Sequence, residues 1–73
     1  MSTATKVVFI DLAYNYGTVY DDLSGAYARG FREGGVNGGK QELISALLAR
    51  AARGEKQTPS RRLKEVEYLR RFN

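Results

Sequence analysis

The chain has 73 residues, no cysteine and no histidine, and a formal net charge of +4 at pH 7. This length predicts one small domain over residues 1–73, with residues 1–5 as a flexible start. The missing residue types exclude disulfides, Cys/His zinc sites and Ser–His catalysis, so we expect no enzyme, no cofactor and no metal site. No long apolar run or signal-peptide pattern is visible, and the expected location is cytoplasmic.

The segment 6–12, Lys-Val-Val-Phe-Ile-Asp-Leu, has the β-branched and aromatic composition of a strand. With a period of two, Val8, Ile10 and Leu12 share one face of it. A lone strand leaves its backbone groups unpaired, so it must form a hairpin through residues 14–17 or pair with a second molecule. Residues 14–17 lack the Asn-Gly or Asp-Gly adjacency of a tight turn, which favours a strand-paired homodimer.

Three helices are expected after the strand, over about residues 18–33, 39–53 and 59–71. The first has a capping box starting at Thr18 and is stopped by Gly34 and Gly35. The second has the strongest apolar stripe in the chain, and the third begins with proline at its first position, Pro59. The predicted fold class is therefore α+β, with one N-terminal strand and three helices.

The stretch from Gly34 to Lys40 has the G-x-x-x-x-G-K spacing of a phosphate-binding loop. Gln41 stands where the motif needs a serine or threonine to hold magnesium, and residues 26–33 before it are helical in pattern. Nucleotide hydrolysis is therefore not expected. The backbone at Gly39 and the charge of Lys40 remain candidates for contacting a phosphate.

Asp11, Asp21 and Asp22 form the one acidic group that could hold magnesium or act in acid–base catalysis. Asp21 and Asp22 fall in the first turn of a predicted helix, where acidic residues stabilise the helix dipole. We expect a structural role for them and assign no catalytic or metal-binding residue.

Basic residues are concentrated in the second half of the chain. Residues 1–39 carry three basic residues against four acidic ones, and residues 40–73 carry nine against four. On the last predicted helix, the residues that recur along one face are Arg61, Lys64, Tyr68 and Arg71. A basic row with a tyrosine suits contact with nucleic-acid phosphates and bases. Glu65 and Glu67 are spaced to pair with this row at i+4, so a solvated charged face is the alternative.

Five tyrosines in so short a chain are many. Tyr14, Tyr16 and Tyr20 cluster around the end of the predicted strand, near Phe9. Aromatic side chains of this kind are common at protein interfaces. They are equally suited to covering a small core.

The segment Gly-Val-Asn-Gly-Gly-Lys-Gln-Glu-Leu-Ile-Ser-Ala-Leu-Leu, residues 35–48, resembles the turn into the second helix of ribbon-helix-helix proteins. The resemblance covers about residues 6–53. It implies a dimer whose paired strands enter the major groove of DNA, with the second-helix N-terminus on a phosphate. The expected strand face is unlike the polar face of that family, because it carries Phe9 and Asp11.

Two functions follow from these patterns. The first is a small basic, non-enzymatic protein associated with nucleic acid, a regulator or accessory factor that acts as a homodimer. Its expected contacts are Arg61, Lys64, Tyr68 and Arg71, with Gly39 and Lys40. The alternative is a phage- or plasmid-type inhibitor or adaptor, such as an anti-CRISPR protein, that binds a larger host protein complex. Its expected interface is Tyr14, Tyr16, Tyr20 and Phe9.

Overall fold

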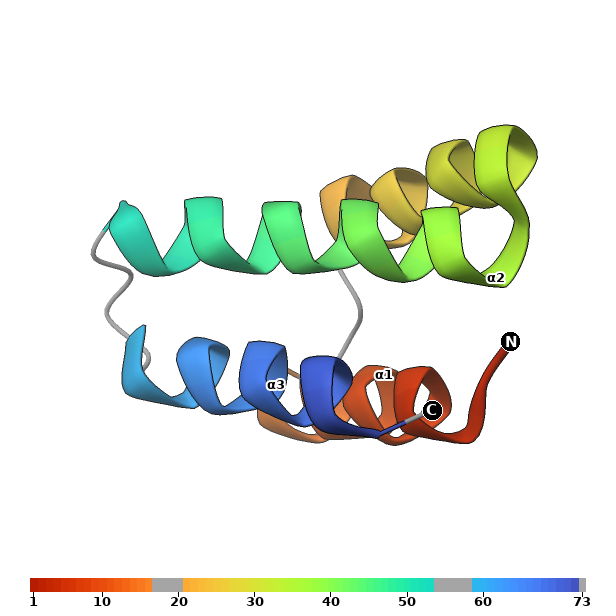
Figure 1. Ribbon diagram of the computed structural model, residues 1–73. Helices are drawn as coiled ribbons and strands as arrows, with labels where there is room; N and C mark the ends of the chain where they lie inside the picture. Colours follow the sequence, from red (N-terminus) through yellow and green to blue (C-terminus); the bar gives the residue numbers. More distant parts are fainter. Residues whose placement is uncertain (17–20, 54–58, 73) are drawn as a thin grey trace.

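The computed structural model describes residues 1–16, 21–53 and 59–72, and within these ranges the protein contains helices and no strand. The helices are α1 (Thr3–Tyr16), α2 (Asp21–Ala52) and α3 (Pro59–Arg71) (Figure 1). The predicted α+β class is therefore wrong for the described residues. No described helix combines the length and the apolar character needed to cross a membrane.

The segment predicted as a strand, 6–12, lies inside helix α1. The side chains of Val8 and Leu12 are 2% and 0% exposed, whereas that of Ile10 is 69% exposed. A strand would have placed these three side chains on one face, but a helix places positions four apart together and turns the residue between them outward. The prediction of a strand was wrong because residues 6–12 form a short run that is apolar on both faces. Such a run has no periodicity that distinguishes a strand from a helix. Without this strand, the prediction of a strand-paired homodimer has no basis.

The start of α1 is fixed by a local cap. The Ser2 hydroxyl oxygen accepts a hydrogen bond from the Thr5 backbone N–H at 3.2 Å, and the two side-chain hydroxyls are 2.8 Å apart. This satisfies one of the N–H groups that every helix leaves unpaired in its first turn. Residues 1–5 were predicted as a flexible start, and Thr3, Ala4 and Thr5 instead belong to the helix.

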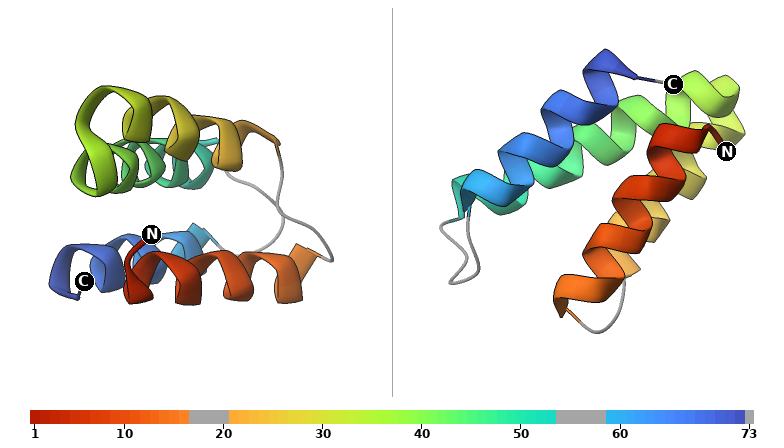
Figure 2. Two further views of the ribbon diagram at one scale, coloured as in Figure 1. Left: turned by 90° about the vertical axis from the view of Figure 1, so that its right-hand side faces the viewer. Right: turned by 90° about the horizontal axis from the view of Figure 1, so that it is seen from below.

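Helix α2 is folded back on itself at Gly34 and Gly35, whose backbone angles are not helical. Gly35 has φ 67° and ψ −150°, a conformation open almost only to glycine. The stop predicted at these two glycines is therefore present. It separates a first arm, residues 21–33, from a second arm, residues 36–52, which lie side by side (Figures 1 and 2).

The two arms of α2 approach each other closely at glycine. A Cβ atom on Gly30 would collide with the backbone carbonyl of Gly38, and one on Gly38 would collide with that of Gly30. A Cβ on Gly39 would lie 2.7 Å from the ring of Tyr27. No larger residue fits at Gly30 and Gly38, where the two backbones meet, and at Gly39 a larger residue would displace the Tyr27 ring.

The molecule has two layers. The arms of α2 form one layer, and α1 and α3 form the other, with α1 beneath the first arm and α3 beneath the second (Figure 2). The core between the layers is formed by Ala4, Val8, Leu12, Leu23, Tyr27, Leu43, Ile44, Leu47, Val66 and Leu69. The bounds of α3 match the helix expected over about 59–71. Within this helix Val66 and Leu69 are buried, whereas Leu63 is half exposed and the neighbouring Arg62 is buried.

Candidate docking surface

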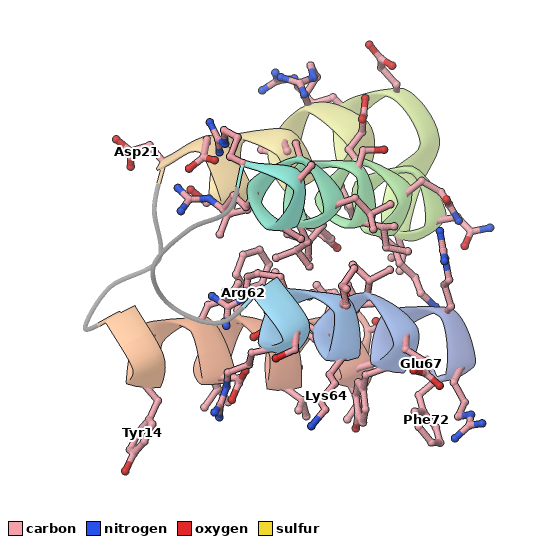
Figure 3. All side chains as sticks on the ribbon, turned by 90° about the vertical axis from the view of Figure 1, so that its left-hand side faces the viewer. Tyr14, Asp21, Arg62, Lys64, Glu67 and Phe72 are labelled. Carbon is pink, nitrogen blue, oxygen red and sulfur yellow. The ribbon has the colours of Figure 1, made fainter. Side chains whose placement is uncertain are left out.

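Helix α1 has apolar residues on two opposite sides. Ala4, Val8 and Leu12 enter the core, whereas the other side presents Val7, Ile10 and Tyr14, which are 42%, 69% and 87% exposed. Their offsets of 0, 3 and 7 place these three side chains in one line along the helix. We call them the apolar stripe. Tyr14 points outward from the lower layer (Figure 3).

A groove of about 540 Å³ runs between α1 and α3 beside the apolar stripe. It is lined by Val7, Val8, Asp11, Ser60, Arg61, Lys64, Glu65 and Tyr68. The two helices diverge along their length, as the view from below shows (Figure 2, right). Of the apolar stripe only Val7 lines this groove, and the cations that line it are Arg61 and Lys64 of α3.

Two ion pairs lie in and beneath the groove. The Arg61 Nη2 group donates a hydrogen bond to Asp11 Oδ1 at 3.0 Å, which joins α3 to α1. Arg62 pairs with Glu65 one turn further on, with 2.6 Å between Nε and Oε1, and its Nη2 donates to Oε2 at 3.1 Å. Both side chains of the second pair are buried, so this guanidinium meets the carboxyl group of Glu65 away from water.

The environment of Glu65 changes its titration. Burial, together with a hydrogen bond shared with Asp11, raises the pKa of this carboxyl from 4.5 to about 8, against the attraction of Arg62, which lowers it. A Glu65 carboxyl group that holds its proton can donate a hydrogen bond to Asp11, whose Oδ1 also accepts one from Arg61 at 3.0 Å.

The basic row predicted on the last helix lies along one side of α3. Lys64 and Arg71 are exposed, and Arg61 is half exposed although it is bound to Asp11. Tyr68 is partly buried and its ring packs on Phe72, with 4.8 Å between ring centroids. Lys64 and Tyr68 line the groove and also, together with Arg71, a smaller hollow of about 160 Å³. We call Lys64 and Arg71 the basic ridge.

The two other residues predicted to contact phosphate are inside the protein. Gly39 is buried under the ring of Tyr27. Lys40 is 8% exposed, and its Nζ donates a hydrogen bond to the Phe72 backbone carbonyl oxygen at 2.8 Å. This bond connects the second arm of α2 to the C-terminal end of α3. Lys40 therefore has a structural role.

Tyr14, one of the predicted protein-interface residues, is 87% exposed. Phe9 is partly buried and packs edge-on against Tyr27, with 5.9 Å between ring centroids. Tyr20 lies outside the described residues, as does the side chain of Tyr16. The structure thus places one predicted interface residue on the apolar stripe and one against the core.

Sequence reasoning missed Val7 and Ile10, because a strand would have buried one or both of them. Sequence reasoning also failed to find the ion-pair partners of the charged side chains. Glu65 was expected to pair with Arg61 four residues before it, but Arg61 pairs with Asp11 instead. The spacing of Val7, Ile10 and Tyr14 at offsets 0, 3 and 7 is the signal that could have revealed the stripe, once a helix is assumed.

Two of the three acidic residues singled out in the sequence, Asp11 and Asp22, are engaged in ion pairs. Asp22 accepts hydrogen bonds from Arg50 at 2.6 and 3.0 Å, and these bonds lower the pKa of its carboxyl. Within the residues that the structure describes, no cluster of three or more Asp, Glu, His or Cys side chains could hold a metal ion. No family model, no curated protein and no solved structure matches this chain.

Proposed function

We propose that this protein is a non-enzymatic adaptor or inhibitor that binds a larger protein through the face formed by α1 and α3. The observation that carries the proposal is the exposure of Ile10 and Tyr14 on a helix whose opposite side is fully buried. Large apolar side chains gathered in one line, beside a groove, are typical of a surface that is covered in a complex. Single exposed apolar residues would carry no such argument.

The internal use of the basic residues supports a protein partner over a polyanion. Arg50 and Arg61 face carboxylates of the same chain, Arg62 is buried against the Glu65 carboxyl group, and Lys40 is held at the end of α3. These contacts remove much of the positive field that the composition indicates. Nucleic-acid binding depends on cations that are free to replace counterions on phosphates.

One specific observation favours nucleic-acid binding as the second candidate. The rings of Tyr68 and Phe72 lie together between the exposed cations Lys64 and Arg71. An aromatic pair flanked by cations can stack on bases while the cations contact phosphates. This candidate leaves the apolar stripe without a role, which is why it stands second.

The test compares proteins captured by cross-linking in cells that express the chain. The Ile10→Glu and Tyr14→Glu variants change the stripe, and Ala28→Glu, an exposed position on the other layer, is the matched control. We expect a partner that is captured by the wild type and the control and lost with both stripe variants. Equal capture by all four proteins would refute a role for the stripe. Salt-sensitive retention on nucleic acid, unchanged by Ile10→Glu, would favour the second candidate.

A further inference from the structure

The first arm of α2, residues 21–33, has an outer face that the fold leaves uncovered. Asp21, Gly25, Ala28 and Arg32 are all exposed, and we call these four residues the arm face. Their offsets of 0, 4, 7 and 11 place them in one line over three helical turns, or about 16 Å. Asp21 projects from the upper layer into solvent (Figure 3). The line therefore begins with an acid and ends with a cation, and the two residues between them are no larger than alanine.

Gly25 has no part in the packing of its own chain. A Cβ atom on Gly25 would meet nothing within 4 Å, whereas one on Gly30 or Gly38 would collide with the other arm. Glycine in the middle of a helix weakens that helix relative to alanine. At Gly25 it also leaves the backbone open to a second helix, because the distance between two helix axes depends on the size of the side chains at their contact.

A hollow of about 500 Å³ lies between the two arms of α2, beside the arm face. It is lined by Gly25 and by the charged residues Asp21, Asp22, Arg29, Arg32 and Glu42. Some of these charges have partners in the same chain. Asp22 is bound by Arg50 at 2.6 Å, and the Arg29 guanidinium lies 3.9 Å from the Glu42 carboxylate.

Asp21 and Arg32 are the charges of the hollow that remain. Within the residues that the structure describes, neither of them takes part in an ion pair. A complementary occupant brings a cation to Asp21 and an acid to Arg32, eleven positions apart on one helical face. The arm face of a second copy does this when it lies antiparallel, because the offsets 0, 4, 7 and 11 are the same when they are read in reverse.

We propose that this protein forms a homodimer in which the first arms of α2 from two copies pack antiparallel through the arm face. Asp21 of each copy then lies opposite Arg32 of the other, and Gly25 lies opposite Ala28, about a two-fold axis. The inference goes beyond the proposed function and leaves α1, in the other layer, accessible to a different protein. A contact of three helical turns is small, so the dimer dissociates on dilution.

The experiment measures self-association of the full chain by sedimentation equilibrium from about 10 µM to about 1 mM, the range that suits a weak dimer. We expect the wild type to change from monomer to dimer within it. Asp21→Arg and Arg32→Asp each bring like charges together at both ends of the contact, and each should weaken dimerisation by at least about 10-fold. The double variant Asp21→Arg/Arg32→Asp exchanges the two charges and should restore the wild-type dissociation constant.

A second variant tests the close approach of the helices. Gly25→Gln should also weaken the dimer, although it should raise the melting temperature of the monomer, because glutamine favours a helix more than glycine does. Lys6→Asp reverses an exposed cation on α1, is the matched control, and should dimerise like the wild type. Ile10→Glu should remain dimeric, and Ala28→Glu should lose the dimer but keep the partner of α1. The dimer and the proposed function are thereby tested separately.

Three results would overturn the inference. A wild type that stays monomeric up to about 1 mM would show that the arm face does not self-associate. A double variant that dimerises no better than the two single variants would show that Asp21 and Arg32 do not meet across the contact. A dimer that survives Gly25→Gln but is lost with Ile10→Glu would place self-association on the apolar stripe instead.

Discussion

The second arm of α2 and helix α1 are both rich in apolar residues, but the fold treats them differently. Leu43, Ile44 and Leu47 of the arm are all buried between the layers. In α1 only one side is buried, and Ile10 and Tyr14 remain in solvent. An apolar side chain in the core stabilises the fold by its removal from water, whereas an exposed one contributes little until a partner covers it. The comparison separates residues that hold this protein together from residues available to another protein.

The largest expected effect lies in the arm. Leu47→Ala should reduce the free energy of unfolding by about 2–5 kcal/mol, because it removes a side chain that is 0% exposed and leaves a cavity. Ile10→Ala, on the stripe of α1, should change it by no more than about 0.5 kcal/mol. Urea denaturation of the two variants measures both values. A loss for Ile10→Ala as large as that for Leu47→Ala would mean that the stripe serves the fold, and the comparison would fail.

A smaller effect is expected where the arms of α2 meet. Gly30→Ala places a methyl group against the backbone of Gly38 and should cost about 1–3 kcal/mol, because the arms must separate. Gly25→Ala, on the same arm, has open space around its Cβ and should instead stabilise the protein by up to about 1 kcal/mol. Denaturation midpoints that move in opposite directions would support the close crossing. Two equal shifts would contradict it.

A third effect concerns the contact between α1 and α3 and depends on pH. Glu65 has its pKa raised from 4.5 in the unfolded chain to about 8 in the folded protein. Between these pH values the folded state holds a proton that the unfolded state has released, so stability falls as pH rises through this window and is level above it. Glu65→Gln removes the titrating group and should flatten that part of the curve.

The pH prediction is checked by urea midpoints of both proteins at about pH 5 and about pH 9. Asp22 does not confuse the result, because its pKa is lowered from 3.8 and its contribution is lost only under more acidic conditions. A wild type equally stable at both pH values, or a glutamine variant with the wild-type slope, would show that Glu65 is not protonated in the folded protein.

Helix α3 and the turn at Gly34 and Gly35 could be predicted from the sequence because their signals are local. Proline at the first position of α3 and the φ of 67° at Gly35 concern only the backbone of these residues and their neighbours. Part of the candidate site was predictable in the same way. The spacing of Lys64 and Arg71 places both on one side of any helix through this segment.

The conformation of residues 6–12 could not be obtained from their own sequence. Their apolar residues satisfy the pattern of a two-sided strand and that of a two-sided helix, and β-branched residues favour the strand only weakly. The helix buries Val8 and Leu12 against α2 and α3 and leaves Ile10 outside. Contacts with residues far along the chain therefore decided both the secondary structure and the identity of the exposed stripe.

By itself the sequence determined the last helix, the break in α2 and the concentration of basic residues in the second half. Tertiary structure decided what those basic residues do. Arg61 lies fifty positions from Asp11 and pairs with it, and Lys40 is thirty-two positions from the carbonyl that it holds. Spacing along a helix finds partners within one or two turns, but a charge selects its partner in space. For that reason only the folded chain shows which charges are paired, and that Val7 of α1 and Lys64 of α3 line one groove.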